Sequence, residues 1–261
     1  MALDRRPMQA MAARTLKTLK FAIEKLENIY SKPIPPLELN GELILGCPYP
    51  RGFTDSTDRI HGFSYDKVQP SSLRDRLIFF GETVDEAPRG KICVKFVRHY
   101  SSDVHQFCAD KGHAPELIAY NPLPGGWNMV VMSVLDIHDD TLPQRRGSYQ
   151  PLSAVTVLDR QALEEPITSL VKALHKHEYV HGDLRDTNFF LRDDGKHFML
   201  LDFDWAGRIG EAHYPMYVNR EGIKRPDDAE DGKKILVEHD LEMLEEIFQQ
   251  VGSAAKRRRV Y

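Results

Sequence analysis

Cysteine is scarce in this chain of 261 residues, and no CxxC pair occurs. Cys47, Cys93 and Cys108 are scattered, and such an odd, sparse count predicts reduced intracellular thiols rather than a disulfide framework. No apolar run approaches the roughly 18 residues that a membrane span needs. The first ten residues also lack the apolar core of a secretory signal. These absences predict a cytoplasmic or nuclear protein without a membrane partner.

A strong excess of one charge is also absent. The chain has 35 Lys and Arg residues against 39 Asp and Glu residues, so its net charge is −4 and general nucleic-acid binding is not expected. Hydrophobic residues make up 41% of the chain and charged residues 28%. This composition predicts one soluble globular unit with a sizeable core, which two lobes could share.

Two short segments, VHGDLRDTNFFL and MLLDFDWAG, carry a pattern suited to phosphoryl transfer. Asp183 and Asn188 lie five positions apart in the first segment, and Asp202 follows Asn188 by fourteen positions in the second. A carboxylate can accept the proton of an attacking hydroxyl. An amide oxygen and a second carboxylate can hold Mg²⁺ on nucleotide phosphates. The order and spacing therefore indicate a kinase-type reaction.

The sequence between these segments predicts a hairpin. Two apolar runs flank the dipeptide Asp194-Gly195, which is typical of a tight turn between antiparallel strands. Asn188 precedes the first run and Asp202 ends the second. The hairpin would therefore bring two ligands of one metal close together in space.

Strand and helix patterns divide the rest of the chain. Short β-branched or aromatic runs predict strands over residues 77–84, 91–97 and 127–134. One helix is expected near residues 103–111, with Ser101 or Ser102 at its start and Gly112 at its end. Helical patterns dominate from about residue 161, including residues 167–177 and a long helix over about 233–251.

An amphipathic helix is predicted at residues 14–31. Its apolar positions recur at steps of three and four: Leu16, Leu19, Ile23, Leu26 and Tyr30. One interpretation docks this helix on the body of the protein. The other makes it a partner-binding or self-associating helix, although these positions span only about two heptads.

The motifs resemble those of the protein-kinase-like superfamily. The HGD loop, with Gly182 where protein kinases usually carry Arg, is similar to compact branches such as choline and aminoglycoside kinases and small atypical protein kinases. The LLDFDWAG segment, with Arg-Asp-Thr before Asn188, looks most like kinase-domain proteins of mushroom-forming fungi. The resemblance covers roughly residues 60 to 250.

This resemblance implies an α+β, two-lobed protein-kinase-like fold with an antiparallel β N-lobe and a shortened helical C-lobe. We expect four regions: an N-terminal amphipathic helix and linker (1–40), a kinase-like N-lobe (41–135), a kinase-like C-lobe (136–252) and a basic tail (253–261). The basic cluster at residues 256–259 is either a nuclear-import signal or a solvated chain end.

The resemblance also implies roles for the residues of the catalytic loop. Asp183 would orient and deprotonate the acceptor hydroxyl. Asn188 and Asp202 would bind Mg²⁺. His181 would pack and hydrogen-bond to hold the loop, and Arg185 would contact the transferred phosphate.

Three further roles fall outside that loop. Lys95, within the apolar run ICVKFV, matches the Lys that neutralises the α- and β-phosphates of ATP; the alternative is an edge-strand Lys facing solvent. Met132 to Val134 would form the hinge that reads adenine, although the end of an apolar strand explains them equally well. Asp240 lies within the predicted apolar face of the last helix, which comprises Val237, Leu241, Leu244, Phe248 and Val251. It would accept hydrogen bonds from the catalytic-loop backbone or lie at the margin of that face.

The chain departs from protein kinases in the region that surrounds the nucleotide. No GxGxxG covers the phosphates; residues 66–76 read DKVQPSSLRDR, where the amides around Ser71 and Ser72 or the charge of Arg74 or Arg76 could act instead. The helical Glu that would pair with Lys95 is missing too, and His105 and Asp103 fall near its place.

The segment after Asp202 departs from that pattern as well. Asp204 replaces the last residue of DFG and would either touch metal or cap a turn. No APE follows, and 59 residues remain after Asp202. Because the Arg of HRD is absent, we do not expect activation-loop phosphorylation to switch activity.

The expected function is ATP- and Mg²⁺-dependent transfer of a γ-phosphoryl group to a hydroxyl, with Asp183 as base. The fungal resemblance favours an atypical protein Ser/Thr kinase. The alternatives are a small-molecule kinase of the choline or aminoglycoside kinase type and a catalytically inactive pseudokinase scaffold.

Overall fold

The computed structural model describes residues 6–31, 50–68, 73, 76–84, 90–138, 147–155, 157–220 and 222–258. These residues form two units, of which the first contains helix α1 and the second contains everything from residue 50 onward. Each unit is described separately below.

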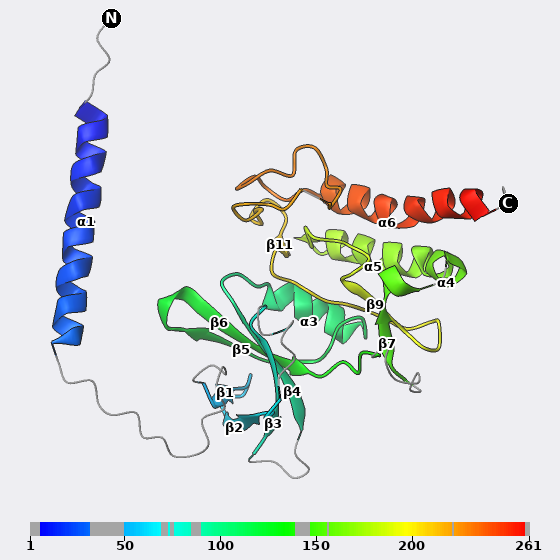
Figure 1. Cartoon of the computed structure of the whole chain (residues 1–261), viewed down its shortest axis with the longest axis horizontal. Helices are drawn as coiled ribbons and strands as arrows, with labels where there is room; N and C mark the ends of the chain where they lie inside the picture. The colour runs from blue at the N-terminus through cyan, green and yellow to red at the C-terminus, as the bar shows by residue number, and fades with distance from the viewer. Residues whose placement is uncertain are drawn as a thin grey trace, which may run out of the picture. The chain divides into compact units, whose positions relative to one another are not determined.

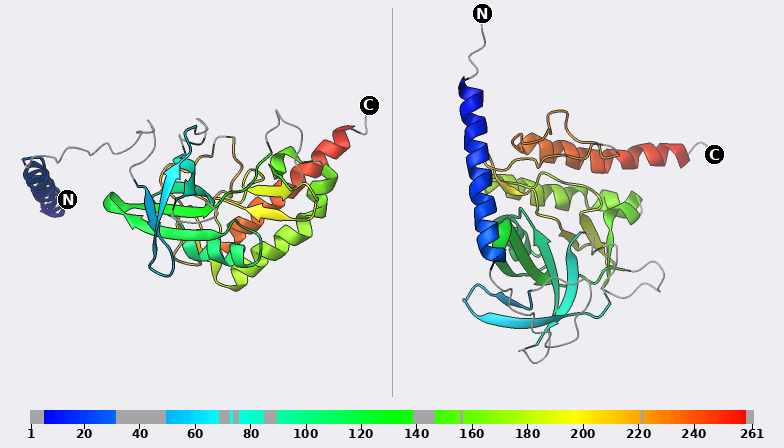
Figure 2. Two further views of the ribbon diagram at one scale, coloured as in Figure 1. Left: turned by 90° about the horizontal axis from the view of Figure 1, so that it is seen from below. Right: turned by 60° about the vertical axis from the view of Figure 1, so that its left-hand side comes forward.

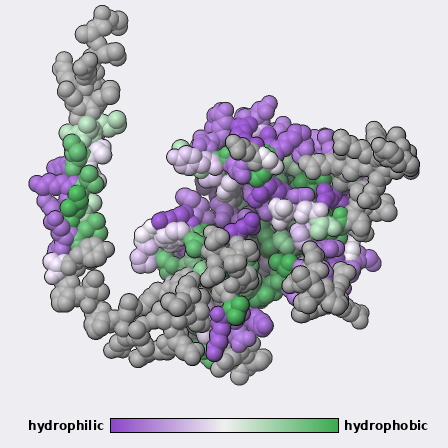
Figure 3. Space-filling model, in the orientation of Figure 1, coloured by the Kyte–Doolittle hydropathy of each residue, from purple (hydrophilic) through white to green (hydrophobic). Residues whose placement is uncertain are grey.

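Helix α1, Arg6–Tyr30, begins eight residues before the predicted start at Arg14. Pro7 suits the first turn of a helix, and the Ala and Met residues that follow favour helix formation, so the earlier start has a local cause. Apolar side chains gather on one side of α1, as Figure 3 shows, and five of them are largely exposed: Leu16, Leu19, Phe21, Ile23 and Leu26. Docking of this helix on the body stays a prediction.

The second unit begins with a six-stranded antiparallel sheet, drawn from blue to green in Figure 1. Its strands are β1 (Gly52–Thr54), β2 (Ile60–Tyr65), β3 (Ile78–Thr83), β4 (Lys91–Val97), β5 (Leu117–Leu123) and β6 (Trp127–Ser133). They lie in the order β1-β2-β3-β4-β6-β5. The antiparallel β-rich N-terminal part is therefore confirmed.

A row of aromatic rings crosses this sheet. The side chains of Phe53, Phe63, Tyr65, Phe79 and Phe96 are buried, and neighbouring rings in the row have centroids 5.0 to 6.2 Å apart. Most of these contacts are edge-to-face or tilted, which suits the ring quadrupoles. The row stabilises β1 to β4 in the register that places Lys95 opposite Ile78.

Helices form most of the remainder. They are α3 (Ser102–Asp110), α4 (Val157–Ala162), α5 (Glu164–Lys176) and α6 (Val237–Arg258). Ser101 caps α3, as one of the two predicted alternatives states, because its hydroxyl accepts a hydrogen bond from Val104 N. Helices α5 and α6 lie side by side in both Figure 1 and Figure 2. None of the described helices has the length and apolar content that crossing a membrane requires.

Short strands connect these helices. They are β7 (Tyr149–Pro151), β8 (Tyr179–Val180), β9 (Phe189–Arg192), β10 (Phe198–Leu200) and β11 (Gly207–Arg208), with 3₁₀ turns η1 (Pro124–Gly126) and η2 (Leu152–Ala154). Strands β10, β9 and β7 form one sheet, and β11 pairs with β8. Buried apolar residues of α3, α5, α6 and the β9–β10 hairpin share one core.

Helix α6 differs from its prediction in where it begins and ends and in which of its sides is buried. It begins at Val237 rather than near residue 233, and it continues to Arg258, so the expected basic tail begins inside the helix. Its buried stripe contains Asp240, Met243, Leu244 and Ile247, whereas Leu241 is 39% exposed. Asp240 lies within the apolar face, as expected, but the face is centred closer to Met243 and Ile247 than the prediction placed it.

Candidate active site

A cavity of about 470 Å³ lies between the sheet and the helical part of the second unit. Its apolar lining includes Ile78 and Phe80 of β3, together with Leu201. Lys95, Asn188 and Asp202 line the same cavity. The cavity therefore offers apolar side chains that can contact a ring together with an ammonium and oxygen ligands, a combination that fits ATP with Mg²⁺.

Lys95 lies in the middle of β4 and is 9% exposed, so the alternative of a solvent-facing Lys is wrong. Its Nζ atom is 2.7 Å from Asp202 Oδ1 and 2.6 Å from Asp204 Oδ1. The acidic partners that sequence reasoning missed are therefore these two carboxylates. Asp204 stood two residues beyond a predicted metal ligand, where only metal contact or turn capping was considered.

The three charged groups shift one another's pKa values. Burial raises the pKa of Asp204, and the charge of Asp202 adds to this, so it reaches about 7 despite Lys95. Burial opposes ionisation of Asp202, but the Lys95 ammonium outweighs it and lowers the Asp202 pKa. Burial alone would lower the Lys95 pKa, yet the two carboxylates raise it. Lys95 therefore stays protonated at neutral pH, as a ligand for phosphate must be.

His105 of α3 lies close to this cluster but does not replace the missing Glu. Its side chain is fully buried, its ring stacks on Phe203 with centroids 4.7 Å apart, and its nitrogens contact Tyr100 Oη at 2.7 Å and Pro115 O at 2.8 Å. Because a carbonyl only accepts, Nε2 donates to Pro115 and Nδ1 accepts from Tyr100. Asp103, the other candidate, is 3.9 Å from Arg208 at the surface.

The buried neutral His105 should make the stability of the protein depend on pH. Burial lowers the pKa of His105 from 6.5 to about 4 in the folded protein. Between pH 6.5 and pH 4, this histidine therefore binds a proton more readily in the unfolded chain than in the folded protein. The free energy of unfolding should be unaffected by this group above pH 7 and fall by about 2 to 3 kcal/mol as the pH drops from 6.5 to 4. Urea titrations of wild type and His105→Gln would measure it. Parallel pH profiles would contradict the prediction.

The catalytic loop depends on Gly182 and on Asp240. Gly182 has φ = +80°, and a Cβ there would lie 2.6 Å from Cδ1 of Ile235, so a larger residue would be strained and crowded. The Asp240 carboxylate is fully buried and accepts hydrogen bonds from His181 N and Gly182 N, both at 2.8 Å. His175 Nε2 lies 3.1 Å from the same carboxylate. Helix α6 thus holds the backbone of the loop.

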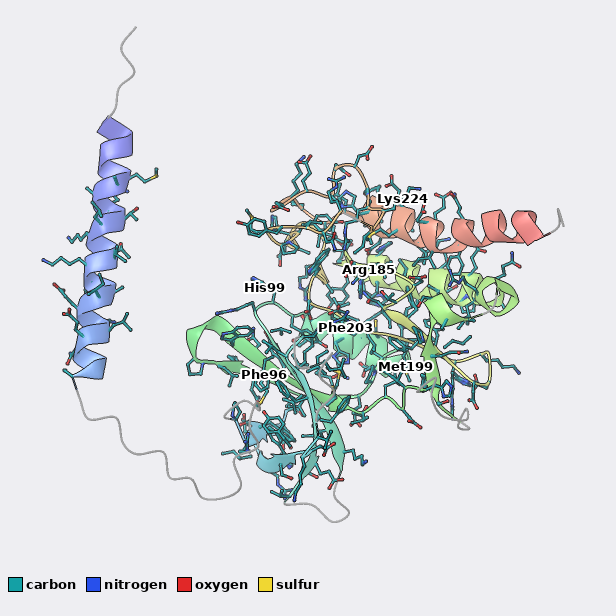
Figure 4. All side chains as sticks on the ribbon, viewed as in Figure 1. Phe96, His99, Arg185, Met199, Phe203 and Lys224 are labelled. Atoms are coloured by element: carbon teal, nitrogen blue, oxygen red, sulfur yellow. The ribbon has the colours of Figure 1, made fainter. Side chains whose placement is uncertain are left out.

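Asp183 is buried and its two carboxylate oxygens contact two arginines. Arg185 donates to Oδ2 at 2.8 Å, and Arg225 donates to Oδ1 at 2.7 Å. Asn188 Nδ2 donates to the backbone oxygen of Asp183 at 2.9 Å. Arg225 was not foreseen from the sequence, because it lies 42 positions away in a loop without a recognised motif. Figure 4 shows Arg185 and Phe203 in the region between the helices and the sheet.

The β9–β10 hairpin places Asn188 and Asp202 next to each other. Leu201 N donates to Asn188 O at 2.9 Å, so a backbone hydrogen bond closes the base of the hairpin beside Asp202. Its turn is longer than predicted, because Arg192 pairs with His197 and four residues lie between them. Asp202 has φ = +71°, a strained conformation that is found at functional sites.

The next feature is the set of side chains that could bind a metal ion. No three His, Cys, Asp or Glu side chains gather into a metal-binding group in the described ranges. Asn188 and Asp202 both line the cavity. A hard cation could bind here through their oxygens if ligand phosphates completed its coordination.

Some of the remaining predicted site residues line the cavity, and others do not. Met132 and Ser133 line the cavity at the end of β6, and the lining then continues with Leu135 and Ile137 rather than Val134. Arg76 also lines it. Ser71, Ser72 and Arg74 lie outside the described residues.

Part of the chain matches a family of kinases. The model of the lipopolysaccharide kinase (Kdo/WaaP) family matches residues 148–214, which contain both sequence motifs. No curated protein matches the chain significantly.

Solved structures show the same fold. The structure of the Cydia pomonella granulovirus kinase PK-1 aligns with a TM-score of 0.51 at 14% identity, covering 72% of this chain and 67% of that one. Vaccinia-related kinase 3 aligns with a TM-score of 0.50 at 14% identity, covering 78% of this chain and 68% of that one. The second unit therefore has a fold similar to that of these kinases, with an antiparallel N-terminal sheet followed by helices.

Proposed function

We propose that this protein is an ATP- and Mg²⁺-dependent phosphotransferase that acts on a hydroxyl group. The observation that carries the proposal is the 2.7 Å contact between Lys95 Nζ and Asp202 in a cavity that Asn188 also lines. The proposed phosphate-binding Lys95 and the proposed metal ligand Asp202 thus meet although they lie 107 positions apart, which supports the assignment. Bound ATP with Mg²⁺ would supply the transferable phosphoryl group and neutralise its charge.

The protein's own residues would mainly bind and orient the reactants. Lys95 would contact the α- and β-phosphates, Asn188 and Asp202 would hold Mg²⁺, and Met132 would border the adenine. Asp183 would accept the proton of the acceptor hydroxyl, which requires a free carboxylate oxygen. The Arg185 side chain is 29% exposed and that of Arg225 only 2%. Arg185 would therefore move to the transferred phosphate and leave Asp183 Oδ2 with only the long 3.4 Å contact from Asn188 Nδ2.

For the acceptor we propose the Ser or Thr hydroxyl of a protein. This choice is supported by the sequence resemblance to fungal kinase-domain proteins, and the two aligned structures are named as kinases without a stated acceptor. A small-molecule acceptor is the second candidate, because the matched family model describes lipopolysaccharide kinases and covers the catalytic segment. A pseudokinase scaffold is the third, since both oxygens of Asp183 are ion-paired in this structure.

Transfer of label from γ-labelled ATP to separate protein and metabolite pools would test function and acceptor together. Wild type should label the protein pool, and Asp183→Ala and Asp202→Asn should not. Label confined to metabolites would replace the protein acceptor by a small molecule. Equal labelling by all three proteins would overturn the enzyme proposal.

Lys95→Met should weaken binding of ATP·Mg²⁺ about tenfold or more, because it removes a charge-assisted contact to phosphate. Isothermal titration calorimetry would measure the dissociation constant. Lys91→Met is the matched control, since Lys91 begins the same strand but is exposed and outside the cavity. Equal affinities of the two variants would contradict the role of Lys95.

A further inference from the structure

Arg225 contacts three different residues in the described structure. Its Nε atom donates to Asn219 O at 2.9 Å, and its guanidinium lies 4.5 Å from the centre of the Trp205 ring. Its NH2 group donates to Asp183 Oδ1 at 2.7 Å. These contacts come from three directions, so the orientation of the guanidinium plane is fixed.

The loop that carries Arg225 is itself tied together. Arg220 donates to the backbone oxygens of Pro226 and Asp227 at 3.2 and 3.1 Å. The neighbouring Lys224 instead pairs with Glu246 of α6, and Figure 4 shows it beside the start of that helix. Adjacent residues thus have opposite environments, because Lys224 is exposed while the Arg225 side chain is enclosed.

The two arginines that contact Asp183 differ in how exposed their side chains are to solvent. Arg185 comes from the catalytic loop itself, reaches Oδ2, and retains 29% exposure of its side chain. Arg225 reaches Oδ1 from a separate loop and is almost completely desolvated. Moving Arg225 away would leave a buried charge unpaired, which is costly, whereas Arg185 can turn toward solvent.

We propose that Arg225 is the positioning residue of the catalytic base. It holds Oδ1 of Asp183 so that Oδ2 faces the acceptor hydroxyl once Arg185 has left. In the reaction, the acceptor oxygen bonds to the γ-phosphorus as the bond to the bridging oxygen breaks, and the hydroxyl proton passes to Oδ2. This inference rests on the proposed function and adds to it a residue that the motifs do not include.

Arg225→Ala should lower kcat about 100-fold, the order expected when a reacting group is misplaced, while KM for ATP stays within about threefold. Guanidinium ion at millimolar concentration should restore part of kcat. A cavity of about 410 Å³ lined by Arg225 and by Glu242, Glu245 and Glu246 offers the cation a path to the vacated place. Lys224→Ala is the matched control. Its kcat should stay close to that of wild type and should not change when guanidinium is added.

A double-mutant cycle separates positioning from general loss of folding. If Arg225 acts through Asp183, Arg225→Ala should cause no further loss of kcat in an Asp183→Asn background. Arg225→Lys, which keeps the charge with fewer donors, should retain more activity than Arg225→Ala, and urea unfolding should show that both are folded.

Three results would overturn the inference: kcat of folded Arg225→Ala within threefold of wild type, no rescue by guanidinium, or an equal loss in the Asp183→Asn background. Each of these leaves the proposed function intact, because wild type still transfers phosphate. Absence of transfer by wild type itself would overturn both.

Discussion

Asp183→Asn should lower kcat for phosphoryl transfer by about 10³-fold or more, with the dissociation constant for ATP changed by less than about threefold. The amide cannot accept the proton of the acceptor hydroxyl, and it loses the charge that pairs with Arg185 and Arg225. Asp183 makes no contact with Lys95, so nucleotide binding should persist. Steady-state kinetics and calorimetry would give the two constants separately.

The control for this substitution is Asp186→Asn. Asp186 lies in the same loop. Its carboxylate is 3.7 Å from Arg160, and neither residue lines the cavity. The control should retain kcat within about threefold, because a partly exposed ion pair contributes little. A similar loss in both variants would show that charge in the loop, and not proton transfer at Asp183, matters.

Asp240→Ala should lower the free energy of unfolding by about 3 to 5 kcal/mol. It removes a fully buried carboxylate and leaves the N–H groups of His181 and Gly182 without their acceptor. Because these amides belong to the catalytic loop, the variant should also lose activity under conditions where it remains folded. Urea unfolding followed by circular dichroism would measure the stability.

Glu242→Ala is the matched control on the same helix, since Glu242 is exposed. Its unfolding free energy should stay within about 0.5 kcal/mol of wild type. A loss below 1 kcal/mol for Asp240→Ala would contradict the account of this carboxylate as the main support of the loop.

The local parts of the site could be predicted from the sequence. Asn188 and Asp202 flank a hairpin whose strands are apolar and whose turn contains Asp-Gly, so their proximity follows from short-range rules. Lys95 stood out because an ammonium in an apolar strand needs a partner. Strands β3, β4 and β6 were predicted because each is a short apolar run between turns, whereas β1, β2 and β5 were not assigned.

The long-range parts could not be predicted in this way. Arg225 meets Asp183 only because a loop between β11 and α6 folds back onto the catalytic loop. The Lys95 partners were sought in a helix, but Asp202 and Asp204 follow the hairpin and reach it from the other side of the cavity. Such contacts depend on tertiary packing, and no periodicity in the sequence encodes them.

The prediction for α6 shows a different limit. Asp240 was correctly placed within the apolar face, yet the face itself was centred on Leu241 rather than on Met243 and Ile247. A polar residue at the centre of a buried stripe shifts any estimate based on hydrophobic periodicity. Its burial becomes reasonable only when the two loop amides that it binds are known.

We propose that this protein moves a phosphoryl group from ATP to a hydroxyl. The most direct test is the initial rate of label transfer from γ-labelled ATP by wild type, measured with Mg²⁺ and again after its removal by a chelator. We expect an acid-stable phosphate ester that forms only with Mg²⁺, and that forms at least about 10³-fold more slowly in Asp183→Asn. Transfer no faster in wild type with Mg²⁺ than in that variant would contradict it.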